Sequence, residues 1–172
     1  MFLKLPIKTR LKPLAFSSAM LIILWCMGLL LGLHIATVVY LPYIGFYYAA
    51  VGARAAFAGL FAVFFLPFLL SVIAIRKGIG WIVFPLAICK AFVLGFNLAM
   101  LQFAFSQSAW LVRIFVMFSD LTSGFLLLWL WLVILSNHEA PKRMHYVAYS
   151  VLAALLILLD YFFISPFLAE IL

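Results

Sequence analysis

The sequence contains very few charged residues, and acidic residues are the rarest of them. Only 9% of the 172 residues are charged, whereas about a quarter are charged in a typical soluble domain. Asp and Glu together number 4, against 11 Lys and Arg, so the formal net charge is +7. The chain is 70% hydrophobic with a mean hydropathy of +1.35. A soluble domain is therefore excluded, because no soluble core could bury so much apolar surface.

Motifs for catalysis and metal binding are also missing. The chain has no glycine-rich phosphate loop, nucleophile elbow, zinc-binding HExxH helix or cysteine cluster. Cys26 and Cys89 lie inside apolar runs, where we expect them to pack as small apolar side chains. His138, Glu139 and His145 share one connection, but their spacing fits no metal motif and favours solvated residues at a membrane surface. We expect no enzymatic activity, no metal and no cofactor.

Five long apolar runs dominate what the sequence does contain. They lie near residues 14–40, 55–75, 80–105, 110–135 and 146–167. About 20 apolar residues are needed for a helix to cross roughly 30 Å of hydrocarbon. The runs are continuous and rich in Leu, Ala and Phe, which disfavours the alternating segments of a membrane barrel. We predict an all-α integral membrane protein, a single domain over residues 1–172 that forms a bundle of five transmembrane helices.

The cationic residues fall on alternate connections between these runs. They are Lys4, Lys8, Arg10 and Lys12 before the first run, Arg76 and Lys77 after the second, and Lys142 and Arg143 after the fourth. The connections at 41–52 and 106–109 contain no Lys or Arg. By the positive-inside rule, we predict a multi-pass protein of the cytoplasmic membrane with a cytoplasmic N-terminus and an external C-terminus. Lipid headgroups explain these cations better than nucleic acid, for which no basic domain exists outside the runs.

Polar and ionisable residues inside the runs are the strongest functional signal, since each is costly to bury in lipid unless it is paired or hydrated. Lys90 and Asp120 each lie about 15 Å from the end of their run, which predicts an intramembrane pair. Arg113 and Asp160 also match in depth, near the external ends of the fourth and fifth runs. We define the predicted polar seam as Lys90, Asn97, Arg113, Asp120, Asp160 and Arg54. Two interpretations remain open. The charges neutralise one another and fix helix register, or they contact a substrate, an ion or a partner.

Small residues recur at every fourth position in the first and third runs. Such stripes allow close contact between helices in lipid. We predict helix packing at Gly28, Gly32 and Ala36 in the first run, and at Ala87, Ala91, Gly95 and Ala99 in the third. Pro67 and Pro85 lie inside the second and third runs, where they can bend the helices.

Three local segments together resemble the stage II sporulation protein M family. The stretch from Lys90 through Gly95-Phe96 to Leu101 resembles that family's basic-x-x-x-x-Gly-Phe segment. The tail Ile164-Ser-Pro-Phe-Leu168 is similar to its closing Ile-Ser-Pro motif, which follows an acidic residue. The basic N-terminus followed by Gly28-Leu-Leu-Leu-Gly32 is similar to the family's first span.

The resemblance implies a non-enzymatic membrane component. The sporulation member is an anchor for peptidoglycan-degrading membrane proteins that act during engulfment, so the first expectation is a scaffold or anchor. Relatives are linked to secretion of, and immunity to, circular bacteriocins, and others resemble permease subunits. The alternative expectation is therefore a transporter-associated or export-associated subunit. Partners would be other integral membrane proteins, the lipid bilayer and a second copy of the chain, with no nucleic acid.

The predicted orientation can be tested with a reporter that is active only in the cytoplasm. Fusion to Leu172 should give no signal, because five spans place the C-terminus outside, while fusion before Lys4 should give a strong one. A strong signal from the Leu172 fusion would contradict the five-span topology.

Overall fold

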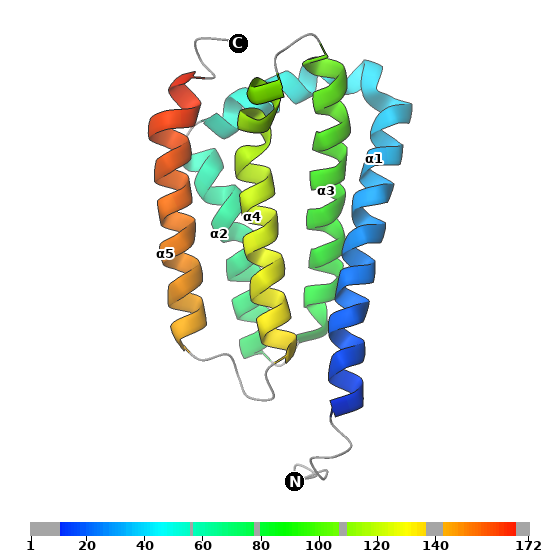
Figure 1. The fold of residues 1–172 in the computed structure, drawn as a ribbon, viewed down its shortest axis with the longest axis vertical. Coiled ribbons are helices and arrows are strands. Elements are labelled where there is room, and N and C mark those ends of the chain that lie inside the picture. The colour runs from blue at the N-terminus through cyan, green and yellow to red at the C-terminus, as the bar shows by residue number, and fades with distance from the viewer. Residues whose placement is uncertain (1–10, 56, 78–79, 107–109, 137–142, 168–172) are drawn as a thin grey trace.

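The computed structural model describes residues 11–55, 57–77, 80–106, 110–136 and 143–167, and all its regular elements are helices (Figure 1). The α-helices are α1 (Leu11–Ala55), α2 (Phe57–Arg76), α3 (Val83–Ala104), α4 (Trp110–Ser136) and α5 (Arg143–Leu159). A short 3₁₀ helix, Gly80–Ile82, precedes α3, and a π-helical segment, η3 (Asp160–Ile164), continues α5.

Five of the helical segments are long and apolar enough to cross a membrane, as predicted. They are Ser17–Val39, Phe57–Arg76, Val83–Ala104, Trp110–Leu135 and Arg143–Phe167. They run alternately up and down the bundle, with α1 and α5 at its two sides (Figure 1). The beginning of α1 and the end of α5 therefore lie at opposite ends of the bundle.

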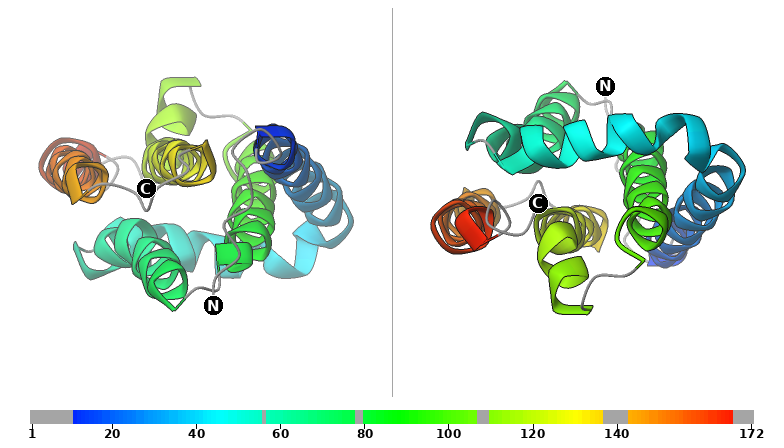
Figure 2. Two further views of the ribbon diagram at one scale, coloured as in Figure 1. Left: turned by 90° about the horizontal axis from the view of Figure 1, so that it is seen from below. Right: turned by 90° about the horizontal axis from the view of Figure 1, so that it is seen from above.

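The first helix differs from the sequence-based prediction. We expected a connection at 41–52, but α1 continues to Ala55 as one element of 45 residues. At 1.5 Å per residue its length is about 67 Å, roughly twice the hydrocarbon thickness. Figure 2 shows how this length is accommodated, since the later part of α1 bends and crosses one end of the bundle toward α2. Helical backbone satisfies its own hydrogen bonds, which favours it over an open loop beside lipid.

The two small-residue stripes pack against each other and bring α1 and α3 into close backbone contact. A Cβ added at Gly32 would lie 2.1 Å from the Phe92 carbonyl oxygen, and one at Gly95 would lie 2.1 Å from the Leu29 carbonyl oxygen. The remaining stripe residues are buried as well: Gly28, Ala36, Ala87, Ala91 and Ala99. Both stripes are therefore buried in contacts between helices of the same chain.

A second contact region joins α2 to α4 and α5 around the Pro67 position. The Tyr149 hydroxyl donates to the Phe64 carbonyl oxygen at 2.7 Å, and the Trp131 indole N–H donates to Ser71 Oγ at 2.8 Å. Ser71 in turn donates to the Pro67 carbonyl oxygen at 2.7 Å. Pro67 has no backbone N–H, so the Val63 carbonyl four residues earlier loses its α-helical partner, and the Tyr149 hydroxyl bonds to the next carbonyl along, that of Phe64. Trp131 of α4 and Tyr149 of α5, both buried, thus donate hydrogen bonds to this part of α2.

Aromatic contacts strengthen the same region. The ring of Tyr149 stacks on Phe68 with a centroid distance of 4.4 Å, and Trp131 meets Trp25 of α1 edge to face at 6.2 Å. Trp131 and Tyr149 are both fully buried. Aromatic pairs of this kind contribute about 0.5–1.5 kcal/mol beyond the area they bury.

The outer surface of the bundle is apolar, as lipid requires. Large side chains such as Val38, Leu30 and Phe163 are mostly exposed. Cys26 and Cys89 are also exposed, so the expectation that they pack inside the spans is wrong. Each lies on a helix face that turns away from the bundle, where a thiol behaves as a small apolar group toward lipid.

The contact between α1 and α3 can be tested with Gly32→Ala. The added methyl group would overlap the Phe92 carbonyl, so the helices must separate, at a cost of about 1–3 kcal/mol. Gly45→Ala is the matched control, because a Cβ there meets nothing within 4 Å and alanine favours helix by up to about 1 kcal/mol. Thermal unfolding in detergent should show a lower midpoint for Gly32→Ala only. Equal midpoints for the two variants would contradict the close contact.

Candidate functional site

The candidate site is a group of polar side chains between α3, α4 and the end of α5. We call it the polar cluster and define it by its residues: Lys90, Asn97, Ser119, Asp120, Ser123, Asp160 and Ser165. All of them are buried except Lys90, which is half-buried. The cluster lies within three of the segments that are able to cross a membrane.

Two hydrogen bonds join α3 to α4. Asn97 Nδ2 donates to Asp120 Oδ2 at 2.8 Å, and Lys90 Nζ donates to Ser123 Oγ at 2.8 Å. Lys90 and Asn97 are two helical turns apart on one face of α3, and Asp120 and Ser123 are one turn apart on α4. The two helices run in opposite directions, so these two bonds together fix the register of α3 against α4.

Ser123 links the two parts of this contact. Its hydroxyl donates to the Asp120 carbonyl oxygen at 3.2 Å while its oxygen accepts from Lys90. The Lys90 ammonium is therefore held one helical turn from the Asp120 carboxylate. The predicted Lys90 and Asp120 pair remains a prediction, and the structure places both residues in the same small cluster.

The remaining side chains of the cluster come from the end of the fifth helical segment, after α5. Asp160 begins the π-helical segment, in which the Ser165 backbone N–H bonds to the Asp160 carbonyl oxygen. The Ser165 hydroxyl donates to Asp160 Oδ1 at 3.4 Å, and Ser119 of α4 forms a side-chain hydrogen bond with the same carboxylate. Asp160 and Asp120 are close enough to interact electrostatically. Two carboxyl groups from different helices therefore share one buried region.

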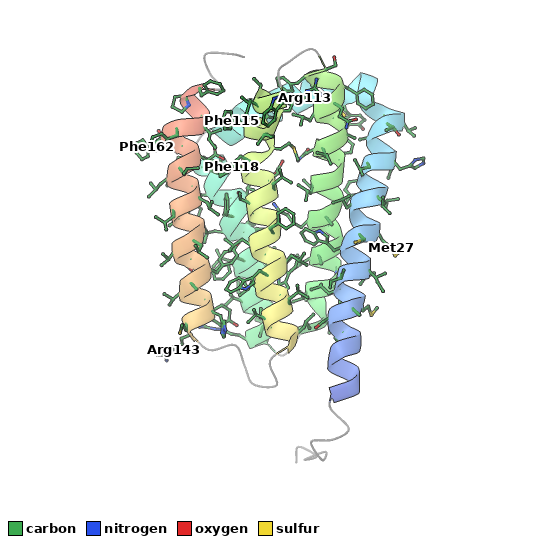
Figure 3. The ribbon with its side chains drawn as sticks, viewed as in Figure 1. Met27, Arg113, Phe115, Phe118, Arg143 and Phe162 are labelled. Carbon is green, nitrogen blue, oxygen red and sulfur yellow. The ribbon has the colours of Figure 1, made fainter. Side chains whose placement is uncertain are left out.

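An aromatic contact lies near the cluster. The ring of Phe115 in α4 meets Phe167, just after Ser165, edge to face at 5.2 Å. Figure 3 shows Phe115 in the upper part of α4. This contact holds the helical residues after η3 against α4 and so helps keep Asp160 facing Ser119.

Two members of the predicted seam lie elsewhere. Arg113 is at the beginning of α4 (Figure 3), where its guanidinium donates to the Ser106 carbonyl oxygen rather than to the Asp160 carboxylate we matched it to by depth. Its Nε atom is buried and has no hydrogen-bond partner within the described part of the chain. Arg54 belongs to the last turn of α1, and its side chain lies outside what the structure describes.

Sequence reasoning missed the three serines of the cluster. Ser119 and Ser123 are one helical turn apart and flank Asp120, which places all three on adjoining faces of α4. That spacing was a usable signal for Ser119 and Ser123. Ser165 had no such signal, because an i to i+5 contact with Asp160 depends on a π-helical turn that periodicity does not predict.

The arrangement can hold charge and protons. It contains an ammonium group, two carboxylates, an amide and three hydroxyls, all directed at one another. Among the described residues, no three His, Cys, Asp or Glu side chains gather as a metal site would require. His34 is exposed, His145 has a buried Nδ1 without a partner in the described ranges, and His138 and Glu139 fall outside them.

Comparison with family models, with curated proteins and with solved structures finds no match for this chain.

The cluster can be tested by removing its charges singly and together. Asp120→Leu should lower the free energy of unfolding in detergent by about 3–5 kcal/mol, because it removes the carboxylate that accepts from Asn97 and, if the predicted pair forms, the charge that neutralises Lys90. Lys90→Met combined with Asp120→Leu should recover most of that loss, since a whole buried pair is often replaceable by apolar residues. Ser123→Ala is the control and should cost only about 0.5–1.5 kcal/mol. Additive losses in the double variant would contradict the pairing.

Proposed function

We propose that this chain is a non-enzymatic scaffold or anchor for a complex of membrane proteins. The observation that carries the proposal is the direction of the cluster's polar groups. Lys90, Asn97 and Asp120 bond to side chains of neighbouring helices in the interior of the bundle. Buried polar contacts used in this way fix helix register and give the bundle a single arrangement, as a rigid platform requires.

The helix faces that are already buried inside the chain limit which surface a partner could bind. Both small-residue stripes are buried in the contact between α1 and α3, so a partner helix must bind another surface. A groove of about 590 Å³ lies between α4 and α5. Its lining residues are Thr122, Phe125, Leu126, Trp129, Leu152, Leu155, Leu156 and Leu159. A concave apolar surface with two large aromatic side chains suits a partner's transmembrane helix, because packing drives helix association in lipid.

The resemblance to the stage II sporulation protein M family suggests what the partners would be. In that family the anchored proteins degrade peptidoglycan during engulfment. The proposal for this chain is that any such activity belongs to the partner, while the chain holds it at the membrane.

A transporter-associated or export-associated subunit is the second candidate, and one observation favours it. Asp120 and Asp160 lie near each other from different helices, and Asp160 begins a π-helical segment. Intramembrane carboxyl groups often relay protons or bind coupling ions, and π-helical turns are frequent at functional sites. For this function, water must reach the cluster from one side.

Site-directed photocrosslinking in intact cells can distinguish the two functions. A photoreactive amino acid at Leu155, in the groove, should crosslink to a different membrane protein, whereas one at Val38 should not. Val38 is the matched control, because its side chain is also apolar and exposed but lies on α1, outside that groove. The adducts are identified by mass spectrometry.

Two results together would reject the scaffold function. If Leu155 gave only lipid adducts or adducts to a second copy, and Asp120→Asn abolished movement of a solute while leaving the protein folded, the scaffold would be rejected. The transport function would then replace it.

A further inference from the structure

The ends of α2 and α5 bring cationic residues together at one end of the bundle. Arg76 is the last residue of α2, Lys77 follows it in a turn, and Arg143 is the first residue of α5. All three side chains are exposed. Figure 3 shows Arg143 at the lower end of α5, and Figure 1 shows α2 ending at the same end of the bundle.

Tyr146 connects the two helix ends. Its ring meets Phe68 of α2 edge to face at 6.2 Å, and it is close enough to Arg76 to interact with its charge. Arg143 precedes Tyr146 by three residues, nearly one helical turn, and therefore lies on the same side of α5. The two arginines thus approach one surface region from two different helices.

The positions of these cations on their helices are not equivalent. Arg76 and Lys77 stand at the C-terminal end of α2, where the helix dipole favours positive charge. Arg143 stands at the N-terminal end of α5, where the dipole disfavours it, and the first turn of α5 contains no acidic residue. Its charge adds to the partial positive charge of the free N–H groups there. In the described first turn of α5 and last turn of α2, no acidic side chain offsets these cations.

The acids in the described part of the chain, Asp120 and Asp160, belong to the polar cluster. Within those described ranges, no carboxylate is therefore left to pair with Arg76, Lys77 or Arg143. Glu139 and Lys142 lie outside the described residues.

We infer that the ends of α2 and α5 form a binding site for the headgroup phosphate of an anionic phospholipid, held by Arg76, Lys77 and Arg143. A phosphate accepts paired hydrogen bonds from arginine, and basic surfaces between membrane helices are suited to acidic headgroups. Exposed cations beside apolar spans meet such headgroups at the membrane surface. The inference does not depend on the proposed scaffold function.

Native mass spectrometry of the full chain in a neutral detergent tests the site. Phosphatidylglycerol should bind more tightly than phosphatidylcholine of the same acyl chains. Arg76→Gln with Arg143→Gln should weaken phosphatidylglycerol binding roughly 25-fold, at about five-fold per cation, and leave phosphatidylcholine binding unchanged. Lys8→Gln with Lys12→Gln is the matched control, because it removes the same charge from another part of the chain. It should change the affinity by less than about three-fold, since neither lysine is among the three residues proposed to hold the phosphate.

Two further measurements show whether the variants are folded and whether the site binds a lipid headgroup or free inorganic phosphate. Without anionic lipid, Arg143→Gln should raise the thermal midpoint by about 1–3 °C, because it removes a cation from a positive helix end. Inorganic phosphate should not displace the lipid at millimolar concentration. The inference is overturned if the arginine variant keeps its affinity, if the lysine control loses as much, if Arg143→Gln lowers the midpoint, or if inorganic phosphate competes fully.

Discussion

A polar group that is buried between apolar helices has no water to bond to, and the arrangement of α3, α4 and α5 depends on that constraint. Each buried polar side chain must find its partner on a neighbouring helix, and only a few relative positions of the helices allow this. Asn97 reaches Asp120 and Lys90 reaches Ser123 in one antiparallel register. A shift of one helical turn would separate both pairs at once, so these contacts specify the bundle more sharply than apolar packing could.

The contact between α1 and α3 works on a different principle. Lipid chains are as apolar as leucine, so two helices gain little from burying apolar side chains against each other in a bilayer. The gain comes from close approach, and glycine permits it where Gly32 meets the Phe92 carbonyl and Gly95 meets the Leu29 carbonyl. Glycine thus sets the distance between α1 and α3, while polar side chains set the register between α3 and α4.

The sequence predicted the helical class and the five apolar segments, because both depend on composition and on spacing within one helix. It also indicated two small-residue stripes, but not that they meet each other between α1 and α3. It failed at 41–52, which we expected to be a connection, because the backbone stays helical across the end of the bundle. Depth arithmetic brought Lys90 and Asp120 to the same region but matched Arg113 to Asp160, because depth says nothing about which way a helix face turns. The donors at the Pro67 position, Trp131 and Tyr149, depend on contacts between distant segments and had no local signal.

The π-helical turn at Asp160–Ile164 lets the chain hold one residue more than an α-helix would between two ends that face the same way. Ser165 reaches the Asp160 carboxylate across five residues because this turn is wider than an α-helical one. Loss of one residue between Tyr161 and Ile164 would leave an α-helical turn, in which the serine stands four residues after Asp160 and still faces it. Pro166 and Phe167 would keep their directions as well. Homologous chains can therefore differ by one residue in this segment and retain the contact, and the identities of Tyr161, Phe162 and Phe163, whose side chains are exposed, matter little to it.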